Sequence, residues 1–70
     1  MGVDMLESDG RLTQAELEVA RLVSLGRTNR EIASETFRSV GTVNAHVHMI
    51  LGKLGVKRRS EIAAWYATKD

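Results

Sequence analysis

Residues 28–54 read TNREIASETFRSVGTVNAHVHMILGKL, and this stretch decides the fold because it predicts two helices in close succession. Thr28 and Glu31 have the spacing of a capping box, in which both side chains accept hydrogen bonds from free backbone amides at the helix start. Three residues of this helix are expected to face the core, namely Ile32, Ala33 and Phe37. Ser39 is a good cap for the second helix. Three residues separate the two helices, which gives the pair the proportions of a helix-turn-helix.

The second helix of the pair carries its large aliphatic residues on one side. At about 100° per residue, these residues fall within an arc of roughly 100°, the width of a core-facing stripe. They are Val40, Val43, Val47, Ile50, Leu51 and Leu54. The opposite arc contains Gly41, Thr42, Ala45, His48, Met49 and Gly52, with Asn44, His46 and Lys53 on its borders. Two exposed glycines cost about 1 kcal/mol each against alanine. We therefore expect this face to contact a partner closely, and the alternative is a weakly selected surface.

The segment before residue 28 predicts another helix. Thr13 and Glu16 repeat the capping-box spacing. Gly26 can end the helix in a left-handed backbone conformation, which glycine adopts at little cost. These signals predict a helix from residue 14 to about residue 25.

The segment from Ser60 onward predicts the last helix. Residues 62–67 read IAAWYA, an almost continuous apolar run that cannot turn all of its sides toward one core. Exposed apolar surface on so short a chain favours self-association, through Ile62, Trp65 and Tyr66. The alternative is that Trp65 closes the core of a single chain while Tyr66 is half exposed.

Composition limits the class of protein. Seventy residues make one domain, for which we expect a flexible leader at residues 1–10 and a folded all-α domain at residues 11–70. Aromatic residues are only 4% of the chain, so aliphatic side chains must form the core. The absence of cysteine excludes disulfides and thiolate zinc sites. Because the chain has neither a signal peptide nor a long apolar run, we expect a cytoplasmic protein without membrane contact.

The net charge of +1 conceals an uneven distribution. Residues 1–18 hold five acidic side chains and one basic one, whereas residues 19–70 hold nine basic and four acidic ones. This division suggests an acidic leader ahead of a body that can approach a polyanion. The alternative is a solvated surface of mixed charge.

The two histidines do not suggest a metal site. His46 and His48 are two residues apart and so do not share a helix face. We expect His46 to be packed and hydrogen-bonded and His48 to project outward. No spacing in the chain suggests a Ser-His-Asp triad or a carboxylate pair. The sequence therefore predicts no enzyme activity, no cofactor, no metal and no small-molecule ligand.

A more specific pattern runs through the whole helical region. Its residues are Leu12-Thr13, Glu16, Glu18-Val19, Gly26, Thr28-Asn29, Glu31-Ile32-Ala33, Ser39, Thr42-Val43, His46, Ile50, Lys53-Leu54, Val56 and Arg59. Over residues 12 to about 67 the chain resembles the LuxR-type (GerE-like) helix-turn-helix domain of bacterial transcription regulators. The resemblance implies a compact four-helix domain whose third helix is the recognition helix in the DNA major groove. It also implies that the fourth helix mediates dimerisation.

The same resemblance implies roles for individual residues. Base-edge contacts fall on Asn44, Ala45 and His48, with Gly41 near the groove wall. Phosphate contacts fall on Asn29, Arg30, Ser39, Thr42, Lys53, Lys57 and Arg58. Arg59 matches a position that ties the last helix to the domain. An asparagine can bond an adenine edge through both amide atoms, and an alanine can contact a thymine methyl.

The chain departs from the family pattern at several positions. Asn44 stands where many members have lysine, so the recognition face has lost positive charge. Thr36 replaces a usual leucine and puts a hydroxyl near the core. Arg38 and Arg58 replace residues that are often apolar and capping, respectively. These departures predict modest affinity for DNA and lower stability than is usual in the family.

Two functions remain open at this point. The first is sequence-specific binding of double-stranded DNA by the output domain of a bacterial transcription regulator, acting as a homodimer through its last helix. The alternative is a protein-interaction module, which docks on a sensor domain or another partner without reading DNA. Steep salt dependence of binding to duplex DNA would distinguish the first from the second.

Overall fold

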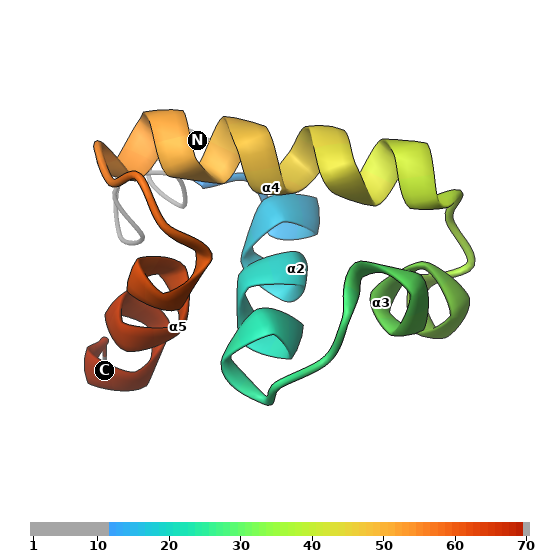
Figure 1. Cartoon of the computed structure of the whole chain (residues 1–70), viewed down its shortest axis with the longest axis horizontal. Helices are drawn as coiled ribbons and strands as arrows, with labels where there is room; N and C mark the ends of the chain where they lie inside the picture. Colours follow the sequence, from blue (N-terminus) through green and yellow to red (C-terminus); the bar gives the residue numbers. More distant parts are fainter. Residues whose placement is uncertain (1–11, 70) are drawn as a thin grey trace, which may run out of the picture.

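The computed structural model describes residues 12–69. Over this range the chain is all-α, with helices α2 (Gln14–Ser24), α3 (Asn29–Thr36), α4 (Val40–Leu54) and α5 (Arg59–Thr68). Figure 1 shows α4 lying across the other three helices, with α2 between α3 and α5. The expected leader at residues 1–10 lies outside the described residues.

The starts of α2 and α3 have the predicted capping boxes. Thr13 Oγ1 accepts from the Glu16 amide at 3.1 Å, and Glu16 Oε1 accepts from the Thr13 amide at 3.0 Å. Thr28 and Glu31 repeat the arrangement at 3.1 and 2.8 Å. Such caps each stabilise a helix by about 1 kcal/mol, because they satisfy amides that have no partner inside the helix. Two short helices thus begin where the sequence predicted.

The ends of α2 and α3 both involve left-handed backbone. Gly26 has a φ of +84°, as predicted. Phe37 has a φ of +56°, which is uncommon for a residue with a large side chain. Its side chain is 95% exposed, so the expectation that Phe37 faces the core is wrong. The cause is local: α3 ends at Thr36, and the left-handed turn directs the next side chain away from the body of the domain.

The core is aliphatic, as the low aromatic content predicted. Its buried members are Leu12, Val19, Ala20, Leu22, Val23, Ile32, Ala33, Val43, Val47, Ile50 and Ile62. In the predicted stripe of α4, Leu51 and Leu54 are partly buried, but Val40 is 40% exposed and does not belong to the core. Val40 is the first residue of α4, and at a helix end a regular stripe can extend beyond the elements that cover it.

Helix α5 contributes to the core through Ile62. This side chain is 0% exposed, so it cannot also contact a second copy directly, and its assignment to a dimer contact is wrong. Trp65 and Tyr66 are partly buried against the core, with their ring centroids 6.3 Å apart in an edge-to-face arrangement. Only part of each ring therefore remains for an external contact.

The hydroxyl of Thr36 lies near the core, as its replacement of a family leucine implied. Its Oγ1 donates to the carbonyl of Ile32 at 2.7 Å, so the polar group is not left without a partner. Between residues 12 and 69, none of the helices has the length and apolar character needed to cross a membrane.

Candidate nucleic-acid interface

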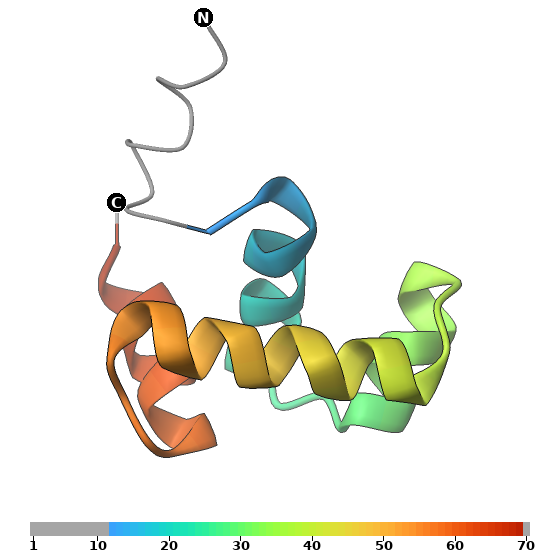
Figure 2. The same ribbon diagram turned by 90° about the horizontal axis from the view of Figure 1, so that it is seen from above.

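One side of α4 is uncovered by the rest of the domain. In Figure 2, α4 lies in front of the other helices along its length. The exposed residues of this side are Gly41, Thr42, Asn44, Ala45, His48, Met49 and Gly52. We call this set the outward face of α4; it contains no lysine, arginine or carboxylate. The predicted face is therefore confirmed as an exposed surface.

The two glycines of the outward face are not required by the packing of the domain. A Cβ atom at Gly52 would meet nothing within 4 Å, and one at Gly41 would meet only Ser39 Oγ at 3.9 Å. Neither has a positive φ. Since glycine lowers helix stability by about 1 kcal/mol against alanine, the domain loses stability here without a gain inside its own structure.

The start of α4 combines free amides with hydroxyl groups. Ser39 Oγ accepts from the Thr42 amide at 3.0 Å, which confirms Ser39 as the cap. The same Oγ donates to Thr42 Oγ1 at 3.0 Å. The Thr42 hydroxyl can therefore donate its own proton to an acceptor other than Ser39. The first amides of a helix have no intrahelical acceptor, and such an end favours an anion.

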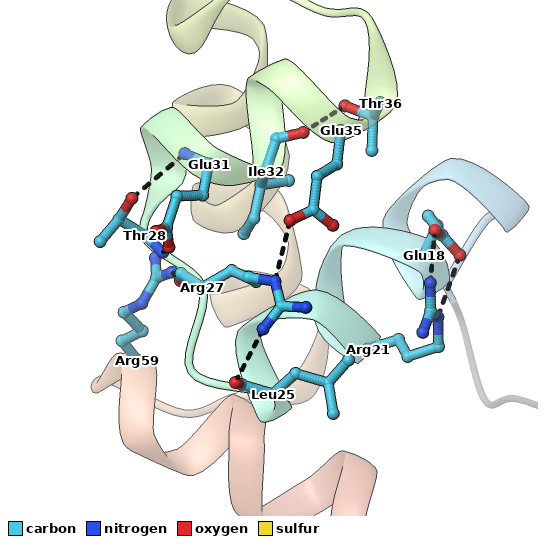
Figure 3. A network of polar contacts seen from close by, with 10 residues as sticks. All are labelled: Glu18, Arg21, Leu25, Arg27, Thr28, Glu31, Ile32, Glu35, Thr36 and Arg59. Carbon is cyan, nitrogen blue, oxygen red and sulfur yellow. Dashed lines mark hydrogen bonds and ion pairs between the residues drawn. The ribbon is translucent and has the colours of Figure 1, made fainter.

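A chain of hydrogen bonds links α4 to α3 and α5. Asn29 Nδ2 donates to Asn44 Oδ1 at 2.5 Å, and Arg59 Nη1 donates to Asn29 Oδ1 at 2.5 Å. Arg59 Nη2 also donates to the carbonyl of Arg27 at 2.6 Å. Figure 3 shows Arg59 reaching from the start of α5 toward Arg27. We call Arg59, Asn29 and Asn44 the amide relay. The expectation that Arg59 ties the last helix to the domain is confirmed.

Lys53 does not lie free at the surface, where its assignment to phosphate contact would place it. Its Nζ donates to Glu16 Oε1 at 2.7 Å, and the two side chains are 30% and 5% exposed. Burial alone would raise the pKa of Glu16, but hydrogen bonds from Lys53 and from the Thr13 amide outweigh it and hold this pKa below its ordinary value. The charge of Lys53 thus serves to attach α4 to α2.

The other three basic residues among the predicted phosphate ligands, Arg30, Lys57 and Arg58, are exposed. The amides of Lys57 and Arg58 both donate to Glu61 Oε1 at 2.8 Å, and these bonds lower the pKa of Glu61. The carboxylate thereby holds the backbone at the start of α5 while both basic side chains extend into solvent.

Two other arginines are engaged within the domain (Figure 3). Arg21 pairs with Glu18 at 2.9 Å on α2, and Arg27 pairs with Glu35 of α3 at 2.8 Å. The exposed cations among the predicted phosphate ligands are therefore Arg30, at the start of α3, and Lys57 and Arg58, between α4 and α5.

The two histidines of α4 have different surroundings. His48 is exposed, as predicted. His46 is partly buried, but its Nδ1 is buried without a hydrogen-bond partner, so the expected hydrogen bond is missing at that atom. One helical turn away on the buried side, Val43 and Ile50 offer no polar side-chain group. Across residues 12–69, no group of three His, Cys, Asp or Glu side chains is placed to hold a metal ion.

Sequence reasoning missed the amide relay and the ion pair between Lys53 and Glu16. The members of the ion pair are 37 positions apart, and Asn29 and Asn44 are 15 apart, so no local periodicity connects them. The helix-turn-helix pattern implied only that α3 packs on α4, which could bring Asn29 near Asn44 but gave no signal for the pairing of Lys53 with Glu16 of α2 or of Arg59 with Asn29.

Two capped helices, a three-residue turn and an exposed second helix define a helix-turn-helix domain. The family model described as "Bacterial regulatory proteins, luxR family" matches residues 10–66. The chain therefore belongs to the luxR family of bacterial regulatory proteins. This membership makes it a DNA-binding regulatory domain rather than an enzyme.

Several curated proteins are similar to the chain. The transcriptional regulatory protein LiaR of Bacillus subtilis (strain 168) is 44% identical over 59 residues, covering 84% of this chain and 28% of LiaR. The oxygen regulatory protein NreC of Staphylococcus aureus (strain JH9) is 45% identical over 58 residues, covering 83% of this chain and 26% of NreC. The uncharacterized transcriptional regulatory protein YvfU of B. subtilis (strain 168) is 38% identical over 61 residues, covering 87% of this chain and 30% of YvfU. The chain spans less than a third of the length of each.

Proposed function

We propose that the chain reads double-stranded DNA as the output domain of a bacterial transcription regulator, with the outward face of α4 in the major groove. The observation that carries this proposal is the pair of glycines that the domain itself does not need. A recognition helix must bring its backbone close to base edges, and small uncharged residues permit that approach. Acting on DNA, the domain would work in the cytoplasm.

Within this face, we assign base contacts to Asn44, Ala45 and His48, with Gly41 against the groove wall. All four are exposed in the first two-thirds of α4. Ala45 can contact a thymine methyl. Specificity would then come from few side chains with little charge.

Affinity in this proposal comes from residues that border the outward face. Arg30, Lys57 and Arg58 are exposed cations, and Ser39 and Thr42 lie at the start of α4. Asn29 would contribute through its backbone amide at the start of α3, because its side chain is bound to Arg59 and Asn44. Phosphate contacts fix the register of a protein on DNA and dominate the salt dependence of binding. We leave Lys53 out of this set because its ammonium group is bound to Glu16.

We further propose that two copies pair on DNA through α5. Ala64 and Ala67 are exposed one turn apart, and the exposed parts of Trp65 and Tyr66 adjoin them in sequence. A two-fold dimer would place its recognition helices about 34 Å apart, one turn of DNA. Ile62 would support this surface from beneath rather than contact the second copy.

A second candidate function is docking on a protein partner. Phe37 is 95% exposed and Val40 is 40% exposed at the α3–α4 turn, and such apolar exposure favours a protein contact. This surface adjoins the start of the recognition helix, so a partner bound there would compete with DNA.

Binding of the 70-residue chain to duplex DNA at increasing salt tests the proposal. Phosphate-dominated binding should weaken steeply, with a log–log slope of roughly 0.9 for each phosphate contact. Absence of binding at low salt would contradict DNA reading and favour the protein-docking function.

A further inference from the structure

The amide relay fixes which atoms of Asn44 are available to a ligand. Arginine has hydrogen-bond donors and no acceptor, so the side-chain oxygen of Asn29 must face Arg59. The NH2 group of Asn29 then faces Asn44, and only the carbonyl oxygen of Asn44 can accept from it. The orientation of both amides therefore follows from the donor-only chemistry of Arg59.

The relay runs from the interior of the domain to its surface. Arg59 and Asn29 are partly buried, and Arg59 is itself held by the Arg27 carbonyl at 2.6 Å. Asn44 is exposed on the outward face. With Oδ1 turned toward α3, the NH2 group is the part of Asn44 that is left to meet an external acceptor.

We propose that Arg59 and Asn29 are positioning residues that set the polarity of Asn44, so that Asn44 offers hydrogen-bond donors to the base it faces. This inference rests on the proposed DNA-reading function and names a preference within it. In the major groove, guanine presents two acceptors (O6 and N7) where adenine presents one (N7) beside the N6 donor, and thymine presents the acceptor O4 where cytosine presents the donor N4. Asn44 should therefore favour the keto bases guanine and thymine over the amino bases at its position.

This preference differs from the one that the sequence alone suggested. Bidentate recognition of adenine requires the asparagine oxygen to accept from N6 while the NH2 group donates to N7. In this structure Asn44 Oδ1 already accepts from Asn29 Nδ2. The bidentate adenine contact would therefore require the Asn29–Asn44 hydrogen bond to break or to share its acceptor, whereas the NH2 group alone could make only the single bond to N7.

The substitution Asn29→Asp reverses the polarity without removing the support. An aspartate keeps an acceptor for Arg59, and it favours the first turn of a helix through the helix dipole. Toward Asn44 it also presents an acceptor, so the Asn44 amide must turn and donate through its NH2 group. The Asn44 oxygen would then face outward and accept from an amino base.

The test compares duplexes that differ only at the base pair facing Asn44, identified as the one whose preference is lost in Asn44→Ala. Each base pair holds one keto and one amino base, so the duplexes are compared by the base on the strand that Asn44 contacts, guanine against adenine and thymine against cytosine. The wild-type chain should bind the duplex with the keto base on that strand roughly threefold to tenfold more tightly, the ratio expected for one net hydrogen bond. Asn29→Asp should reverse this ratio. Ser34→Asp, which adds the same charge to an exposed position of α3, should lower affinity for all duplexes and retain the keto preference.

Two results would overturn the proposal. One is a keto preference that persists in Asn29→Asp; the other is a wild-type preference for amino bases. A measurement without DNA tests the relay itself: NMR of the free chain should detect a coupling across the hydrogen bond between Asn29 Nδ2 and Asn44 Cγ, and its absence would overturn the relay. If the wild-type chain binds no duplex at low salt, both the proposed function and its base preference are contradicted. The NMR result alone then decides whether the relay exists.

Discussion

The two ends of α4 are attached to the domain by different chemistry. Near its C-terminus, Lys53 forms an ion pair with Glu16 of α2 at 2.7 Å, and the carboxylate is almost entirely buried. In its first half, Asn44 is held by uncharged Asn29 at 2.5 Å and remains exposed. The charged contact thus serves attachment, whereas the neutral contact leaves an uncharged surface for a partner. Stability and recognition should therefore respond to different substitutions.

The largest effect should come from breaking the ion pair. In Lys53→Met the Glu16 carboxylate stays buried with only the capping contacts of Thr13, which should lower the free energy of unfolding by about 2 kcal/mol. Urea denaturation measures this change. Lys57→Met, at an exposed lysine, is the control and should have little effect. Equal stability of the two variants would contradict the role of Lys53 in attachment.

The next largest effect should follow from removing the origin of the amide relay. Arg59→Ala deletes two hydrogen bonds, to the Arg27 carbonyl and to Asn29, and should cost about 1 to 2 kcal/mol. Arg58→Ala removes a neighbouring exposed arginine and should be nearly neutral. Thermal denaturation of both variants provides the comparison, and a neutral Arg59→Ala would show that α5 is held by the core alone.

A smaller effect should appear as acid sensitivity. The pKa of folded Glu16 lies below its ordinary value of 4.5, so its stabilisation is present above that value and is lost as the pH falls through the lower folded pKa. Denaturation at pH values from 7 down to 3 should show this loss in the wild-type chain. Because Lys53 causes much of the lowering, Lys53→Met should lose less stability across the same range. If the wild-type chain and Lys53→Met lost the same stability as the pH falls, the ion pair would not be the source of the acid sensitivity.

The smallest effect on stability should come from the exposed end of the relay. Asn44→Ala removes one hydrogen bond at the surface and replaces the residue with a better helix former, so the two changes should nearly cancel within about 0.5 kcal/mol. Urea denaturation checks this value. A loss as large as that of Arg59→Ala would mean that Asn44 is a structural residue, and the division between attachment and recognition would fail.

Much of the fold could be predicted because its signals are local. The capping boxes at Thr13 and Thr28 and the cap at Ser39 depend on neighbours three residues away, so spacing alone identifies them. The outward face of α4 follows from helical periodicity. Gly26 is predictable as a helix end because few other residues adopt a left-handed conformation at low cost.

The errors arose where tertiary context decides. A helical period continued past Thr36 predicts Phe37 in the core, but the backbone turns left-handed at Phe37 and the period ends there. Ile62 and Trp65 could not be separated by hydropathy, since both are apolar, yet Ile62 has no exposed surface. The phosphate role that the resemblance implies for Lys53 does not fit the structure, because the carboxylate that binds this lysine lies on a helix that is distant in sequence.

In the proposed interface, discrimination by Asn44 and affinity from exposed cations are separate properties of one surface. The affinities of the wild-type chain, Asn44→Ala and Lys57→Ala for a selected duplex and for a random one test this claim. Asn44→Ala should lose about 1 to 3 kcal/mol on the selected duplex alone, whereas Lys57→Ala should weaken both and reduce the salt slope by about 1. Uniform loss on both duplexes in both variants would contradict the claim.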